Sequence, residues 1–404
     1  MSTSLLYHAW GVRGYQLSAT RFGQRRVWFQ IEHDPKSLRC AHCGSTRTQK
    51  FGKIPRRFRT LPIGSRPVIL QLAIQRLHCF DCHKTAQVAL GFADPGRSYT
   101  RAFERYVLDL SQIASISDIA RHLQVSWDIV RDIQKRHLVQ HYSRPKLKKL
   151  KHIAIDEISV GQGHRYLTVV LDLDSGRIVF VGEGKGADSL DVFFKRLRAS
   201  HAHVEAVATD MSLAYILAVA QHLPKAIHVF DRFHVVKLFN DKLSQLRREV
   251  QREAEGPLQK KVLKGTRWLL LKHPDNLDPE RNERQRLDEA LKLNEPLAKA
   301  YYLKEDLRQL WEQDNQVQAS AFLDDWIARA RSSGVRMLQQ FAQTLVLHRR
   351  GLLNWYRCSI STGPLEGTNT KIKLLQRQAY GYRDMEFFRL KIYALHRTTH
   401  ALVG

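Results

Sequence analysis

The sequence predicts a multidomain α+β protein in which small N-terminal modules precede an α/β domain that carries an all-helical insertion. Three observations predict this fold class. Two Cys-x-x-Cys pairs lie within residues 40–82, two short amphipathic helices joined by a tight turn follow them, and from residue 152 short apolar strands lead into alternating strands and helices. A chain of 404 residues is also too long for one ordinary core.

The composition indicates a polyanionic partner. Lys and Arg number 65 against 39 Asp and Glu, so the net charge is +26, and most of this excess lies in residues 1–150. Such a surface attracts nucleic acid because each neutralised phosphate releases counterions. An anionic membrane would attract it as well, but the chain carries neither a basic amphipathic anchor nor a lipidation signal. No stretch approaches the ~20 apolar residues of a membrane span, and Met1–Trp10 does not have the pattern of a signal peptide. We therefore expect a cytoplasmic protein with no membrane partner.

The cysteine pairs, Cys40–Cys43 and Cys79–Cys82, have the spacing of metal-binding knuckles, and Gly44 lets the first knuckle turn. Each pair can chelate one tetrahedral ion, and four thiolates complete a closed structural zinc shell. The alternative is four buried thiols in a core, but two paired spacings favour one structural Zn²⁺. We expect residues 1–97 to form a zinc-ribbon-like module.

The stretch between the cysteine pairs, Lys53–Arg59, is expected to be a basic loop that contains an aromatic residue. Its arginines, Arg56, Arg57 and Arg59, would bind a phosphate backbone. A solvated run of charge is the alternative, and this stretch alone does not decide between the two.

Residues 98–142 are expected to form a helix-turn-helix domain. Ser117 and Ser126 are good N-caps for two short helices, and the turn around Gln124 is tight. The second helix would then be a recognition helix, with DNA contacts from Trp127, Arg131, Lys135 and Arg136. The alternative is a helical hairpin that touches no DNA. Residues 143–151 follow as a basic linker, in which Lys148 and Lys149 are further candidates for phosphate contacts.

The pattern changes at His152, where the first part of an α/β domain, residues 152–232, begins. Three apolar stretches separated by turns predict an antiparallel meander, and the alternation that follows predicts parallel pairing. This order is that of an RNase H-like fold. The strands are expected at 153–155, 166–171, 178–181, 204–209 and 226–230, and the helices at 189–199 and 212–222.

Residues 233–355 are rich in Leu, Lys, Arg, Glu and Gln and are expected to be an all-α insertion. Residues 356–404 would then supply the second part of the α/β domain and the C-terminal helices, at 362–378 and 384–400.

Three carboxylates are expected to meet in the α/β domain. Asp156 ends the first strand, Asp210 ends the fourth, and these strands are neighbours in an RNase H-like sheet; Glu366 lies at the start of a late helix. Converging carboxylates repel each other and persist if divalent cations neutralise them. Hard oxygen ligands favour Mg²⁺ or Mn²⁺, two per site. Any single Asp at a strand end is more often a cap than a ligand, and strand alternation points Glu157 to the other face.

Asp231 and His234 follow the fifth strand and begin a long helix, so both side chains would face the same pocket. A catalytic role for the imidazole, orienting water or a phosphate, is one interpretation. The other is that Asp231 caps the helix and His234 lies on its surface.

The chain resembles transposases of the bacterial ISL-three insertion-sequence family. The matching stretches are Cys40–Cys43 with Cys79–Cys82, the helix-turn-helix at 117–136, Ile153–Glu157, Ala208–Asp210, Phe230–His234, and Gly363–Asn369 with Lys371 and Lys373. The resemblance implies an acidic-triad catalytic domain interrupted by an α-helical insertion, with Asp156, Asp210 and Glu366 as metal ligands. An Asp-x-x-His like that of Asp231 and His234 lies between the second Asp and the Glu in many such enzymes. Lys371 and Lys373, which follow the Glu, would contact DNA.

This resemblance implies a DNA transposase that binds the terminal inverted repeats of its element and catalyses metal-dependent strand cleavage and transfer into target DNA. We expect double-stranded DNA as the partner, a homodimer or higher oligomer at the paired ends, and a location with the bacterial nucleoid. Two alternatives remain: a DNA-binding regulator with an inert RNase H-like domain, and a structure-specific nuclease without strand transfer.

Overall fold

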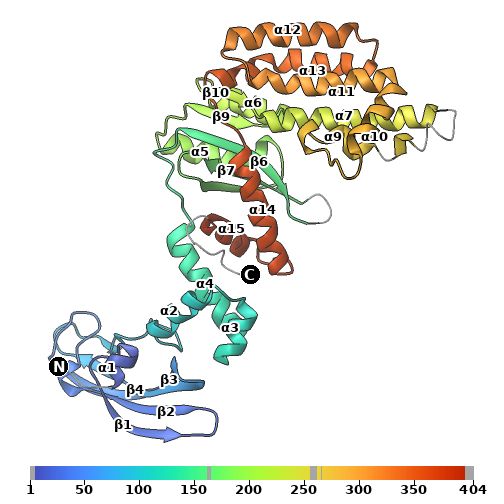
Figure 1. The fold of residues 1–404 in the computed structure, drawn as a ribbon. Helices are drawn as coiled ribbons and strands as arrows, with labels where there is room; N and C mark the ends of the chain where they lie inside the picture. Colours follow the sequence, from blue (N-terminus) through green and yellow to red (C-terminus); the bar gives the residue numbers. More distant parts are fainter. Residues whose placement is uncertain (1–4, 162–164, 255–261, 265, 396–404) are drawn as a thin grey trace. The chain divides into compact units, whose positions relative to one another are not determined.

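The computed structural model describes residues 5–161, 165–254, 262–264 and 266–395. The chain forms two compact units, the first made of residues 1–143 and 374–404 and the second of residues 144–373 (Figure 1). Each unit is described by itself below. The observed boundary between the two units, at Ser143 and Arg144, falls at the start of the predicted linker, residues 143–151.

The first unit opens with a short helix and a five-stranded sheet in the order β1-β2-β4-β3, with β5 paired to β4. The β2–β4 pair is parallel and the other pairs are antiparallel. Apolar residues on one face, such as Ile31, Phe58 and Leu70, form its core. The elements are α1 Leu5–Trp10, β1 Tyr15–Phe22, β2 Val27–His33, β3 Thr48–Ile63, β4 Arg66–Cys79 and β5 Thr85–Gln87.

The predicted basic loop at Lys53–Arg59 is wrong, because these residues lie inside β3 and pair with β4. Arg57 and Arg59 share one face of this strand, but Arg57 is exposed whereas Arg59 is buried, because Arg59 lies against the end of α3. The Arg59 guanidinium donates to the carbonyls of Val68 and Leu123, at 3.1 and 3.0 Å. Arg59 therefore ties the sheet to the helices that follow and is not free to bind phosphate.

Four helices complete the first unit: α2 Arg101–Leu110, α3 Ile116–Leu123, α4 Trp127–Tyr142 and α15 Met385–Ala394. Phe103, Ile119 and Val130 share one core with Phe387 and Leu390 of α15. The last described helix thus packs against the helix-turn-helix, although α4 ends at Tyr142 and α15 begins only at Met385. The remainder of the helix predicted at 384–400, from residue 396, lies outside the described residues.

The second unit is built on the sheet β10-β9-β6-β7-β8, in which β6, β7 and β8 form an antiparallel meander and β9 and β10 join in parallel. This is the predicted RNase H-like layout, and all predicted strands and helices of this part are present. Helices α5 and α6 cover one face through a core that includes Ile155, Val170, Phe193 and Tyr215. The elements are β6 His152–Ser159, β7 Tyr166–Asp172, β8 Arg177–Glu183, α5 Asp191–Ala199, β9 Ala206–Thr209, α6 Leu213–His222 and β10 Ile227–Phe230.

The predicted basic linker packs on this sheet domain. Leu147 and Leu150 are buried in its core, whereas Lys148 and Lys149 are exposed. The two buried leucines hold the segment on the domain, and the two lysines between them point to solvent.

The regular structure in the described residues of the insertion is helical, as predicted (Figure 1). Phe239, Trp326 and Phe341 are in mutual edge-to-face contact in its core. Its core continues into the sheet through Phe230 of β10. Gly351 permits this close approach, since a Cβ there would lie 2.3 Å from the Phe230 ring. The helices are α7 Arg232–Glu253, α9 Arg267–Leu271, α10 Glu283–Lys292, α11 Glu295–Arg308, α12 Gln316–Ser332 and α13 Arg336–Leu353; α14 Gly363–Gln378 follows them.

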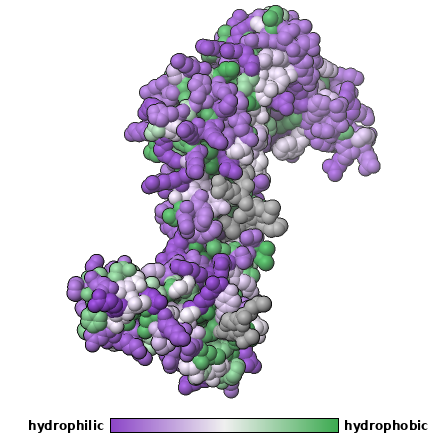
Figure 2. Space-filling view, turned by 90° about the vertical axis from the view of Figure 1, so that its left-hand side faces the viewer, coloured by the Kyte–Doolittle hydropathy of each residue, from purple (hydrophilic) through white to green (hydrophobic). Residues whose placement is uncertain are grey.

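The face shown in Figure 2 is largely hydrophilic over both units, with hydrophobic residues scattered in small groups. Among the described residues, no helix combines the length and apolar character that a membrane-spanning helix needs.

Candidate functional site

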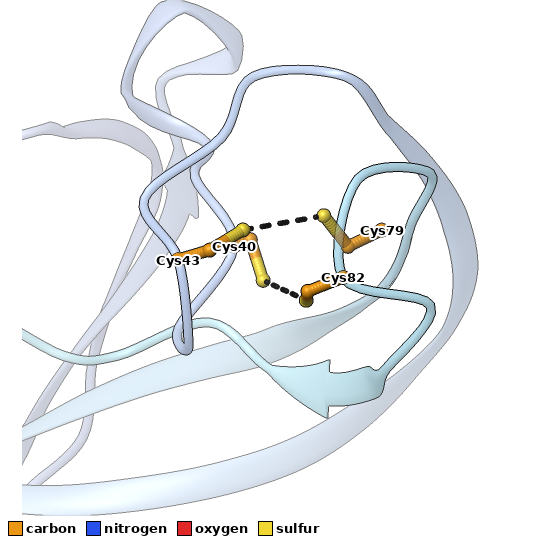
Figure 3. A group of neighbouring side chains, drawn as sticks. All are labelled: Cys40, Cys43, Cys79 and Cys82. Atoms are coloured by element: carbon orange, nitrogen blue, oxygen red, sulfur yellow. Dashed lines mark hydrogen bonds between the residues drawn. The ribbon is translucent and has the colours of Figure 1, made fainter.

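The four cysteines gather at one point of the first unit (Figure 3). Their sulfur atoms all lie within 4.8 Å of one another; the Cys40–Cys82 and Cys43–Cys79 sulfurs are 3.6 and 3.5 Å apart. A tetrahedral zinc ion with bonds of about 2.3 Å requires sulfurs roughly 3.8 Å apart, so the four side chains fit such an ion with little movement.

The two knuckles that present these sulfurs have matching backbones. Gly44 follows Cys43 with φ +74°, as predicted, and His83 follows Cys82 with φ 55°. Inside the first knuckle, backbone N–H groups of Cys43 and His42 point at the Cys40 thiol and lower its pKa to about 6. The N–H of Cys82 likewise lowers the pKa of Cys79. The first cysteine of each knuckle is thus favoured as a thiolate, the form that binds zinc, whereas hydrogen bonds with neighbouring thiols and burial raise the pKa of Cys43 and Cys82.

We predict one zinc ion per chain, and its loss should unfold the N-terminal module, because binding energy at such a site is folding energy. Cys79→Ser should lower the zinc content measured by mass spectrometry, and the thermal unfolding transition of the N-terminal module should disappear. Cys358→Ser is the matched control, since this lone cysteine lies in the second unit and should leave both unchanged. A zinc-free chain that keeps its N-terminal fold would contradict the prediction.

The helix-turn-helix is formed by α3 and α4, with Gln124 at the turn in the left-handed region (φ 52°). Ser126 caps α4 as predicted, by accepting from the N–H of Ile129. The predicted cap at Ser117 is wrong: Ser115 caps α3 and accepts from the N–H of Asp118. Helix α3 therefore begins two residues earlier, because Ile116 is needed in the core.

The recognition helix presents fewer free cations than its sequence predicts. Trp127 is 45% exposed, and the Arg131 guanidinium lies over its ring at 5.6 Å. Lys135, predicted to face outward, is paired with Asp384 and Glu386 of α15, at 2.8 and 2.7 Å.

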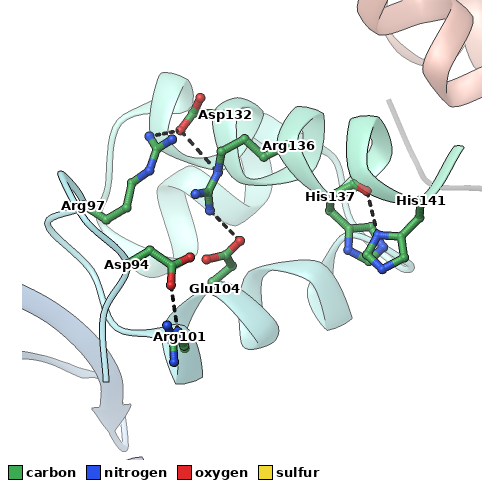
Figure 4. A network of polar contacts seen from close by, with 8 residues as sticks. All are labelled: Asp94, Arg97, Arg101, Glu104, Asp132, Arg136, His137 and His141. Carbon is green, nitrogen blue, oxygen red and sulfur yellow. Dashed lines mark hydrogen bonds and ion pairs between the residues drawn. The ribbon is translucent and has the colours of Figure 1, made fainter. Parts of the chain in front are cut away.

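Arg136, farther along α4, is paired with Glu104 of α2 at 2.5 Å and lies beside the Arg97–Asp132 ion pair (Figure 4). These pairs hold α2, α4 and the loop before α2 together. Of the four DNA contacts predicted on this helix, Trp127 and Arg131, near its start, lie outside these ion pairs.

Three aspartates lie side by side at the carboxyl end of the parallel strands of the second unit. Ala154 pairs with Ala208, so the same register two residues later sets Asp156 beside Asp210. Thr209 pairs with Phe230, which sets Asp231 next in the row, and the N–H of Asp231 donates to the Thr209 carbonyl at 3.0 Å. Ligand and catalytic groups gather at this edge of open α/β sheets.

Asp156 does not end its strand as predicted. Strand β6 continues to Ser159 in pairing with β7, and Asp156 lies where the β9 partner stops. Its carboxylate accepts from the N–H of Glu157 at 2.8 Å and from the side-chain amide of Asn369 at 2.9 Å. Burial raises the pKa of Asp156, the charge of Asp210 raises it further, and His234 opposes the shift. A cation beside Asp156 and Asp210 would offset both the cost of burying the Asp156 charge and its repulsion by Asp210.

Glu157 points to the opposite face, as strand alternation predicts, and accepts from the hydroxyl of Tyr215 at 3.4 Å. It shares that face with the core under α5 and α6. Although it adjoins Asp156 in sequence, it therefore lies away from the row of aspartates.

Glu366 lies in the first turn of α14 and is exposed. Helix α14 is fixed to the row of aspartates by two hydrogen bonds: Asn369 donates to Asp156, and the buried hydroxyl of Thr362 donates to Asp231 at 2.6 Å. Within the described part of the chain, the four cysteines are the one group of three or more Cys, His, Asp or Glu side chains whose ligand atoms lie close enough together to hold a metal ion. Asp156, Asp210 and Glu366 do not form such a group. The structure thus brings Asp156 and Asp210 together and places Glu366 on a helix docked against them, without closing the triad.

Asp231 stands at the N-cap position of α7, yet its side chain makes no cap hydrogen bond and instead holds Thr362. It is 2% exposed. His234, one turn later, is half-buried and lies close enough to Asp156 to act on its pKa. The structure therefore gives Asp231 and His234 different partners, although the sequence suggested that they act as a pair.

Sequence reasoning missed Thr362 and Asn369 as members of the site. Both flank Glu366 in the stretch Thr362–Asn369, and the sequence signal was no more than an Asn one helical turn after a candidate ligand. The remaining candidates, Lys371 and Lys373, are exposed on α14, and Arg56 is half-buried and donates to the carbonyl of Arg97.

Comparison with known proteins assigns each module. Three family models match in succession: a zinc-finger of the transposases IS204/IS1001/IS1096/IS1165 at residues 36–82, the helix-turn-helix domain of transposase family ISL3 at 88–138, and the ISL3 transposase domain at 153–392. The third model alone covers more than half of the chain, and all three confirm the predicted order of modules.

Whole-chain relatives agree with the family models. The transposase for insertion sequence element IS1001 of Bordetella parapertussis is 32% identical over 95% of this chain and 96% of its own length. The transposase for element IS1557 of Mycobacterium tuberculosis is 32% identical over 86% of this chain and 83% of its own length. A solved Drosophila P element transposase strand transfer complex aligns with 74% of this chain and 93% of its own, at 11% identity and a TM-score of 0.37. The chain belongs to the ISL3 family of transposases.

Proposed function

We propose that this transposase binds the terminal inverted repeats of an insertion sequence and cuts and joins DNA strands with Asp156, Asp210 and Glu366. The observation that carries the proposal is the strand register, which sets Asp156 beside Asp210 at one edge of an RNase H-like sheet. Glu366 belongs to the helix that docks on that edge through Asn369. Family membership supplies the reaction class, DNA cleavage and strand transfer.

The donor set fits Mg²⁺ or Mn²⁺, which prefer carboxylate oxygens. Asp156 and Asp210 would hold the ions and Glu366 would complete the shell, and the raised pKa of Asp156 supports a need for nearby positive charge. Two such ions, when bound, activate an attacking oxygen and stabilise a leaving oxygen in phosphoryl displacement.

The other residues of the site have supporting roles in this proposal. Asn369 is a positioning residue, because its amide fixes the orientation of the Asp156 carboxylate. His234 would donate to the scissile phosphate or orient the attacking water. Lys371 and Lys373, exposed on α14, would bind the strand that enters the site.

The exposed first turn of α4 would read the element ends, and Arg57, Lys148 and Lys149 would contact phosphates. Because the reaction pairs two DNA ends, we further propose a homodimer or higher oligomer in the active complex. DNA as the substrate also implies a location with the nucleoid.

A joining assay tests the proposed function. The purified chain should join a duplex that carries a cleaved element end to a supercoiled plasmid, and it should do so only when Mg²⁺ or Mn²⁺ is present. An otherwise identical duplex with a 3′-deoxy terminus is the matched control, because it lacks the attacking hydroxyl and should bind without joining. Cleavage of the element end with no joined product would show a nuclease and contradict the proposal.

A further inference from the structure

A cleft in the first unit separates the recognition helix from the segment that follows α14. Its volume is about 1080 Å³. One wall comes from α3 and the first turn of α4, including Arg121, Trp127 and Arg131, and the other comes from residues 378–387, including Tyr380 and Arg383. From this geometry we propose that residues 379–383 form the second half of the DNA-binding surface of the helix-turn-helix. The inference rests on the proposed function and names a part of the DNA interface that the sequence motif does not contain.

The two walls are held in a fixed arrangement. Phe387 and Leu390 share a core with Val130 and Ile133 of α4. Lys135 joins them through its ion pairs with Asp384 and Glu386. Its role is thus to position the 379–383 segment, and its charge is already neutralised.

The lining of the cleft carries a net positive charge, since its ionised side chains are the arginines Arg121, Arg131 and Arg383 and the aspartates Asp118 and Asp384. Of the lining carboxylates, Asp118 accepts from Ser115 and Arg121, and Asp384 is held by Lys135. In the part of the chain that the structure describes, neither Arg131 nor Arg383 has an ion-pair partner within 4.0 Å, and the Nε atom of Arg131 is buried without a hydrogen bond. Arg131 acts electrostatically on Asp384 without a close ion pair. Guanidinium groups on both walls that make no close ion pair suit a polyanion, and double-stranded DNA already contacts one wall in the proposed function.

Tyr380 is a residue that folding does not explain. Its side chain is 100% exposed, so it buries no apolar surface. Its backbone has φ 52°, the left-handed region at the end of α14, where Gly or Asn is favoured and a bulky side chain is strained. A strained and fully exposed aromatic residue gains its contacts from a partner, and a tyrosine beside a DNA backbone supplies both a hydroxyl donor and apolar contact area.

Affinity and stability should therefore change in opposite directions at this position. Tyr380→Gly in the full-length chain should raise the melting temperature, because it relieves the strain, and weaken binding to an end-bearing duplex about fivefold or more by fluorescence anisotropy. Arg383→Ala should reduce the slope of log affinity against log salt by about 0.9, the loss of one phosphate contact. Tyr302→Ala is the matched control, since this tyrosine is 59% exposed in the insertion and should leave both affinity and slope unchanged.

Arg131→Ala distinguishes failure of this inference from failure of the proposed function. If Arg131→Ala weakens end binding while the Tyr380 and Arg383 variants bind normally, the composite surface is wrong and the helix-turn-helix acts alone. If Arg131→Ala also binds normally, the proposed DNA contact of the recognition helix is wrong. Variants at Tyr380 and Arg383 that alter only the sedimentation of the chain would assign the cleft to a second copy and overturn the inference.

Discussion

Substitution of Asp156, Asp210 or Glu366 by Ala is expected to lower strand cleavage by at least about 10³-fold while end binding stays within about twofold. A lost group that stabilises transition-state charge costs this much. The register of β6 and β9 sets the first two carboxylates side by side, and the residues proposed to read the element ends, Trp127 and Arg131, belong to the other unit. The measurement is Mg²⁺-dependent nicking of an end-bearing oligonucleotide, with a gel shift on the same duplex.

The strand itself offers a matched control and a test of mechanism. Glu157→Gln removes the adjacent carboxylate, which faces Tyr215 on the other side of the sheet, and should keep nicking within about threefold. Asp156→Asn should lose nicking without losing melting temperature, because burial and Asp210 already disfavour the Asp156 charge. Retained nicking in any one of the three Ala variants would remove that residue from the site. A matched fall in melting temperature would instead assign it a structural role.

The sheet and its aspartates could be predicted because their signals are local and periodic. Apolar runs bounded by turns located every strand of the second unit, and the parallel pairing of β6 with β9 followed from strand order alone. The spacing of the four cysteines likewise predicted the zinc site. In each case a rule of backbone geometry converts sequence distance into spatial proximity.

Long-range polar contacts decided what the sequence could not show. Lys135 has the helical position of a DNA contact, but its partner Asp384 lies 249 residues away. Arg59 has the side chain of a phosphate ligand, yet it is buried and donates to the carbonyls of Val68 and Leu123 in two other elements. Asn369 was quoted within a motif, and only its hydrogen bond to Asp156 shows its place in the site.

The boundary of α3 shows a smaller limit of the same kind. Ser115 and Ser117 are both acceptable N-caps by residue type, so propensity alone cannot choose between them. Burial of Ile116 in the core of the helix-turn-helix requires it to be helical, and this selects Ser115. Tertiary packing thus set the helix start, and local preference only restricted the choice.

The second large effect is expected at His234, where Ala should slow cleavage about 10²-fold with no loss of melting temperature. The imidazole is half-buried in the first turn of α7 and acts electrostatically on Asp156. A positioned proton-transfer group contributes on this scale.

Asp231→Ala should behave differently, because the buried Asp231 carboxylate accepts a hydrogen bond from Thr362. The free energy of unfolding should fall by about 1–3 kcal/mol, and activity should fall with it. Thr362→Val should reproduce the Asp231 phenotype, since it removes the same hydrogen bond from the other side. Asp241→Asn, at an exposed position farther along the same helix, is the control that should change neither quantity. Single-turnover cleavage and thermal melting of the four variants separate the roles. If His234→Ala melts early in step with its lost activity, or cleaves at the normal rate, the imidazole has no part in the chemistry and the site reduces to its carboxylates and the helix docked against them.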